Sequence, residues 1–108
     1  MANYALATVV SASKATVTAG TRVALVAAST IVYDVSIKAL AANTGKIYVG
    51  SVAVTSSNGY ELSAGESVTL GSMVQSNDLG RPPKIDLSGV YIDSSVSGEG
   101  VRIIYTVR

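Results

Sequence analysis

The chain has no histidine and no cysteine in its 108 residues. Without histidine, neither a Ser-His-Asp nor a Cys-His catalytic arrangement can be built. Zinc, copper and non-haem iron sites would also lack their usual ligands. The absence of cysteine excludes a disulfide bond and leaves the redox compartment unspecified. We therefore expect no enzymatic activity and predict no cofactor or metal site.

Phenylalanine and tryptophan are also absent, so six tyrosines are the only aromatic residues. Valine, isoleucine, leucine and alanine must fill the core, and valine alone occurs sixteen times. Such β-branched and small residues suit pleated, half-buried strands. A chain of this length forms one domain and buries somewhat more than ~60% of its unfolded surface.

Charged residues are scarce, at 14% of the chain against about 25% in typical domains. Two explanations are open. The protein is a monomer whose surface is rich in serine and threonine, or other subunits cover part of its surface. We favour the second interpretation, because the centres of protein interfaces are depleted in charge. The net charge of +1 comes from scattered basic residues that form no stripe. Nucleic-acid binding is therefore not expected.

No segment has the character of a membrane anchor. The most apolar run, residues 23–33, ends at Asp34 and is shorter than the ~18 residues that a spanning helix needs. Residues 1–12 are apolar but lack the basic start of a secretory signal. The sequence therefore predicts neither a membrane contact nor a signal peptide.

Short alternating segments separated by glycine and asparagine dominate the chain. The clearest is residues 33–39, in which Tyr33, Val35, Ile37 and Ala39 share one face. Strands are also expected over 22–27, 46–50, 51–55, 66–70, 85–87, 90–93 and 101–107, while residues 1–13 are either an N-terminal arm or a first strand. This pattern predicts an all-β fold, a single-domain antiparallel β-sandwich of jelly-roll-like type over residues 1–108.

Two features have alternative explanations. Residues 47–52 resemble residues 90–96, through convergence of two hairpins or through the pseudo-symmetry of two Greek keys. Residues 71–84 form a long irregular stretch with two prolines, and such loops are usually functional or mobile.

The carboxylates and tyrosines form no recognisable catalytic or metal-binding pattern in the sequence. The seven carboxylates lie mostly at strand ends and turns, where they commonly serve the turn itself. A calcium site near Asp93 or Asp78 lacks the ordered ligand spacing of known loops. Tyr48, Tyr60 and Tyr91 would either stack on a sugar or cover a sheet face or interface, and the second use is commoner.

An ordered set of β-turn-β units resembles small virion structural proteins of tailed bacteriophages. The units are residues 35–39, 43–50, 59–60, 62–68, 86–93 and 98–101, so the resemblance covers about residues 33–107. It implies a β-sandwich that decorates or cements a capsid, or one that sits on a fibre. It supplies no catalytic residues.

The resemblance implies a phage capsid decoration or cement protein, located on the virion surface, whose partner is the major capsid protein. It also implies a homo-oligomer, with a trimer favoured over a dimer. The alternative is a head-fibre or tail-fibre module that holds host glycan. The candidate contact residues are Tyr4, Leu6, Val9 and Val10 near the N-terminus, Leu79, Arg81, Pro82 and Pro83 in the irregular stretch, and Tyr48 and Tyr91.

Overall fold

A computed structural model describes residues 8–71 and 84–107 of the chain. These residues form ten strands and one turn of 3-10 helix, η1. The elements are β1 (Thr8–Ala15), β2 (Val23–Ala24), β3 (Ile31–Val32), β4 (Asp34–Ala39), β5 (Ile47–Gly50), β6 (Tyr60–Leu62), β7 (Ser67–Gly71), β8 (Ile85–Asp86), η1 (Leu87–Gly89), β9 (Tyr91–Ser94) and β10 (Gly100–Val107).

The strands pair as a set of nested antiparallel ribbons. β1 pairs with β10, β2 with β9, β3 with β8, β4 with β7 and β5 with β6. Further pairing joins β10 to β4 and β9 to β5, which gives two four-stranded sheets with the orders β1-β10-β4-β7 and β2-β9-β5-β6. We call these sheet A and sheet B. The nesting supports the jelly-roll-like prediction, since it is how one long hairpin wraps around a core.

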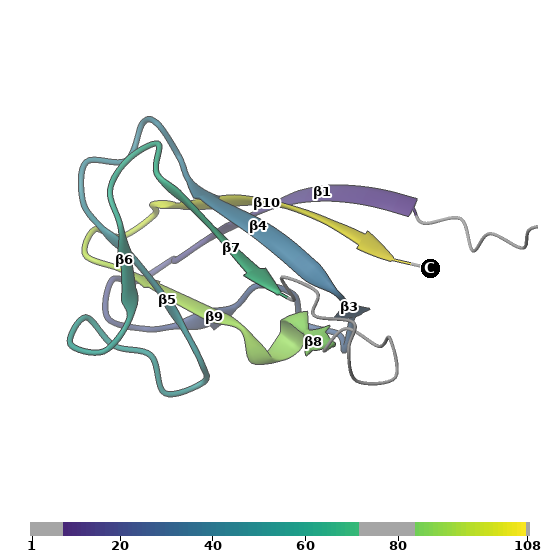
Figure 1. Cartoon of the computed structure of the whole chain (residues 1–108). Helices are drawn as coiled ribbons and strands as arrows, with labels where there is room; N and C mark the ends of the chain where they lie inside the picture. The colour runs from purple at the N-terminus through teal and green to yellow at the C-terminus, as the bar shows by residue number, and fades with distance from the viewer. Residues whose placement is uncertain (1–7, 72–83, 108) are drawn as a thin grey trace, which may run out of the picture.

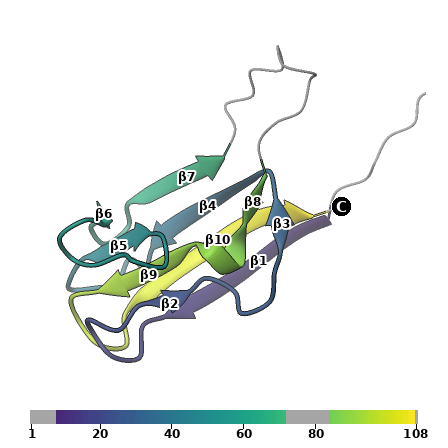
Figure 2. The ribbon, with the colours of Figure 1, turned by 90° about the horizontal axis from the view of Figure 1, so that it is seen from below.

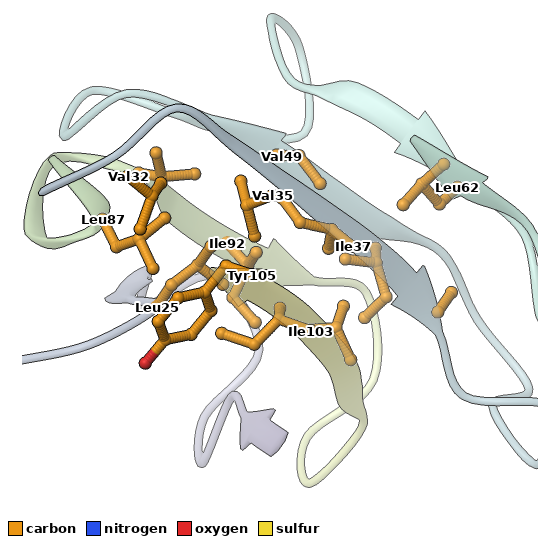
Figure 3. Packing of buried hydrophobic residues seen from close by; sticks show 14 residues of the cluster. Leu25, Val32, Val35, Ile37, Val49, Leu62, Leu87, Ile92, Ile103 and Tyr105 are labelled. Atoms are coloured by element: carbon orange, nitrogen blue, oxygen red, sulfur yellow. The ribbon is translucent and has the colours of Figure 1, made fainter. Parts of the chain in front are cut away.

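The two sheets face each other across the core (Figures 1 and 2). The inward residues of sheet A come from alternate positions: Val35, Ile37 and Ala39 on β4, and Val101, Ile103 and Tyr105 on β10. Ile47, Val49, Leu62 and Ile92 meet them from sheet B, and Figure 3 shows several of these side chains in contact range. The all-β sandwich is thus confirmed, with aliphatic side chains filling the space that aromatics would otherwise occupy.

A loop covers the outer face of sheet B. Residues 51–55, predicted as a strand, form turns instead, and Val54 is buried at 2% exposure. Ideal Cβ atoms added to Gly50 and Gly59 would lie 2.8 Å and 2.9 Å from Val54 Cγ2. The two glycines therefore create the space that lets the loop pack on its own sheet.

Several strand boundaries differ from the prediction. The first strand runs to Ala15, beyond the predicted end at residue 13, and the segment 22–27 contributes only the two-residue β2. The predicted strand 85–87 ends at Asp86, whose carboxylate caps η1 by accepting from the Ser88 backbone N–H at 3.0 Å. β3 and β6 were not predicted. They are two and three residues long, too short to show an alternating pattern.

Candidate functional site

The two ends of the sandwich differ. One end, which we call the tied end, consists of the loops over residues 16–22, 40–46, 63–66 and 95–99. The other, the open end, is where Thr8 pairs with Val107 and Asp34 pairs with Gly71. Lys84 also lies at the open end, since β8 pairs with β3 immediately before β4. The chain therefore enters β1, leaves β7 and re-enters β8 at one end of the molecule (Figure 1).

Glu99 holds the tied end together. Its carboxylate accepts from the Thr44 N–H at 2.6 Å, the Thr44 hydroxyl at 2.8 Å and the Gly45 N–H at 2.9 Å. These bonds join the β4–β5 loop to the β9–β10 loop. Hydrogen bonds from the backbone N–H groups hold the pKa of Glu99 below its ordinary value. The carboxylate thus serves the fold.

Asp86 has a similar role near the open end. It accepts from the Ser29 hydroxyl at 2.6 Å, the Ser88 hydroxyl at 2.8 Å and the Thr30 N–H at 3.0 Å. The Ser29 hydroxyl is the main cause that lowers the pKa of Asp86 well below its usual range. Asp93, which is buried, accepts from the N–H groups of Gly20 and Ser94.

We expect stability to fall in acid because of Asp86 and Glu99. Their folded-state pKa values are lowered, so their contribution is present in full above the unfolded values of about 4 and is lost as the pH falls below them. Thermal unfolding between about pH 2 and 6 should show the midpoint dropping at the acid end. The variant Asp86→Asn/Glu99→Gln should show a flatter dependence; an unchanged slope would contradict this assignment.

No group of three or more metal-ligating side chains occurs among residues 8–71 and 84–107. Within those same residues, no helix has the length and hydropathy that crossing a bilayer would need. The three carboxylates described above face backbone N–H groups and hydroxyls.

Exposed aliphatic residues lie at both ends of the sandwich, with Val17 at the tied end and Val9 and Ile31 at the open end. Val9 on β1 is 65% exposed and Ile31 on β3 is 51% exposed. Ile104, on the outer face of β10, is 49% exposed and faces Ser11 and Ser36 across the sheet. Ile31 and Ile104 were not among the predicted contact residues. Alternation along 101–107 placed Ile104 opposite the core face, but β3 gave no such signal.

The predicted residues of β1 separate into two groups. Val9 points outward from sheet A, whereas Val10 is half-buried and packs against the core. Val10 faces Tyr105 in the pairing of β1 with β10. Val10 therefore packs partly against the core and is less exposed than Val9. Tyr4, Leu6, Leu79, Arg81, Pro82 and Pro83 lie outside the described residues.

The two predicted tyrosines also separate. Tyr48 is only 9% exposed, because the loop that carries Val54 and Gly59 covers it. A sugar cannot stack on a covered ring, so Tyr48 leaves the candidate set. Tyr91 is half-buried on the same outer face and lines an open hollow of about 470 Å³ with Arg22, Val52, Thr21 and Gly20. Nε of Arg22 donates to the Val52 carbonyl oxygen, which anchors the guanidinium beside this hollow.

Comparison of the chain with protein-family models, with curated proteins and with solved structures finds no match.

Proposed function

We propose that this protein is a phage capsid decoration or cement protein that binds the outer surface of the shell through its open end. Val9 and Ile31 carry this proposal: both are more than half exposed, Val9 lies beside the Thr8–Val107 pair, and Ile31 pairs with Asp86 on β8. The resemblance to virion proteins and the low charge content support it. The role would be mechanical, with each copy bridging subunits of the major capsid protein against the pressure of packaged DNA.

The division between the two ends agrees with such a role. Hydrogen bonds join neighbouring loops at the tied end. The Thr16 N–H donates to the Glu99 carbonyl oxygen at 2.9 Å, and the Lys46 N–H donates to the Ser95 hydroxyl at 2.8 Å. A body that is rigid at one end can transmit load from contacts at the other. Stable docking would bury ~1,200 Å² or more in total, so Val9 and Ile31 would be part of a larger contact.

The test is co-sedimentation of purified protein with expanded capsid shells. The variant Val9→Ser/Ile31→Ser removes two exposed aliphatic side chains without adding charge. It should bind about tenfold or more weakly, because each buried aliphatic side chain contributes ~1.5–3 kcal/mol when fully covered.

Val17→Ser is the matched control, since Val17 is 80% exposed but lies at the tied end. It should bind as the wild type does. Absence of wild-type binding to the shells would contradict the decoration role. Equal weakening by Val17→Ser would contradict docking by the open end.

Tyr91 favours a second candidate, a fibre module that binds host glycan. Its ring lies at the hollow where Arg22 is anchored, and aromatic rings and guanidinium groups suit sugar faces and sugar carboxylates. Binding on a glycan array should then be lost in Tyr91→Ala. It should persist in Tyr60→Ala, because Tyr60 is 62% exposed but is not among the residues that line the hollow. No binding by the wild type would dismiss this candidate.

A further inference from the structure

Among residues 8–71 and 84–107, no strand pairs with the outer edge of sheet A at β1. β1 is eight residues long and is the last strand of its sheet, with β10 on its inner side. All eight residues pair with β10 in one continuous register, so no bulge twists the edge away. In an antiparallel pair, alternate residues direct their N–H and C=O groups to the far side. β1 therefore presents a row of backbone donors and acceptors to a further strand.

This edge has one of the usual protections against pairing, because Lys14 faces the buried Val101 and so lies on the inner side near the end of the strand. Natural edge strands carry proline, bulges, charges or a covering segment. β1 has no proline, and Lys14 is its only charged residue. The remaining side chains are threonine, valine, serine and alanine, all small enough to lie beside a neighbouring strand.

The inner face of β1 extends beyond sheet B. Ala12 faces Ile103, which is 3% exposed, so Ala12 points toward the core side. Ala12 is nevertheless exposed, because β2, at the corresponding edge of sheet B, spans only two residues. The inward side chains of a strand added beside β1 would lie next to Ala12 on this face.

We propose that β1 pairs antiparallel with β1 of a second copy of this chain, which joins two A sheets into one eight-stranded sheet. A two-fold axis gives a closed dimer in which both copies use the same edge. Residues that face each other across the two β1 strands lie on the same face of the sheet. Because side chains alternate along a strand, the inner faces of both copies lie on one side only when the two residue numbers of each facing pair are both even or both odd.

The register centred on Ser11 gives the most favourable side-chain neighbours across the interface. It places Val10 beside Ala12 of the second copy, an apolar pair on the core side. It places Lys14 beside Thr8 of the second copy, which keeps the two lysines six positions apart along the strand. Ser11 then faces its own copy across the axis on the outer face, where it is exposed in the single chain. In this register Val9 faces Ser13 of the second copy, so the interface adjoins the open end, but its formation does not require capsid binding.

Size measurement of the full chain tests the proposal. Analytical ultracentrifugation over a concentration series should give twice the 11.0 kDa mass of one chain. Ser11→Lys and Ser11→Glu each place like charges in direct opposition and should each raise the dimer dissociation constant about tenfold or more. An equimolar mixture of the two variants should restore the dimer, because the opposed charges then attract.

Thr69→Lys is the control on the opposite edge of the same sheet, on β7. It should leave the dimer unchanged. A monomeric wild type, a trimer, loss of assembly in Thr69→Lys, or a mixture that does not restore the dimer would each overturn the proposal. Circular dichroism of both Ser11 variants should match that of the wild type, since Ser11 is exposed in the single chain.

Discussion

Gly100→Ala is expected to destabilise the protein by about 3 kcal/mol or more, in the upper part of the range for overpacking. Gly100 faces Ala15 where β10 begins. A Cβ at this position would lie 2.1 Å from the Lys14 carbonyl oxygen and 2.6 Å from Ala15 Cα. Both atoms belong to backbone, so relief requires β1 to move away from β10. Urea unfolding followed by circular dichroism measures the loss.

Two further contacts increase the cost of this substitution. The Gly100 carbonyl accepts from the Leu40 N–H at 3.1 Å and from the Asn43 side-chain amide at 2.9 Å. A displaced Gly100 would therefore disturb the β4–β5 loop as well. Gly89→Ala is the matched control, because a Cβ at Gly89 meets nothing within 4 Å. We expect its free energy of unfolding to stay within about 1 kcal/mol of the wild type. Equal effects in both variants would show that steric contact is not the cause.

Ile103→Ala is expected to cost about 2–5 kcal/mol, the usual range for removing a large aliphatic side chain from a core. Ile103 is 3% exposed and lies within the cluster that joins the two sheets (Figure 3).

The adjacent residue supplies the control for this second prediction. Ile104→Ala makes the same chemical change in the same strand, but Ile104 points outward and is 49% exposed. Its cost should stay below about 1 kcal/mol, the scale of strand propensity and surface substitution. Equal losses in the two variants would contradict the inward and outward assignment of β10.

The open end and the β1 edge adjoin, because Val9 lies on β1. Ile31 bears on capsid docking alone, Tyr91 on glycan binding and Ser11 on assembly. Single substitutions at Ile31, Tyr91 and Ser11 should therefore each change one readout and leave the other two near wild type. The resemblance to phage proteins favours a trimer, whereas the β1 edge favours a dimer, and the measured mass distinguishes them.

Local residue patterns determined the fold class and the inward faces of the long strands. Alternation in 33–39 and 101–107 assigns Val35, Ile37, Ile103 and Tyr105 to the core, because a strand turns each successive side chain to the opposite face. Those residues are all buried. The scarcity of charge and the absence of histidine likewise follow from composition alone.

Only the tertiary structure decided which segments meet. The nested pairing joins strands as far apart as β1 and β10, and such contacts depend on packing across the whole chain rather than on local pattern. Tyr48 and Tyr91 look equivalent in the sequence, yet a loop buries Tyr48 because Gly50 and Gly59 leave it room. Val9 and Val10 are neighbours of the same type, and the position of sheet B alone makes one a surface residue and the other a residue packed partly against the core.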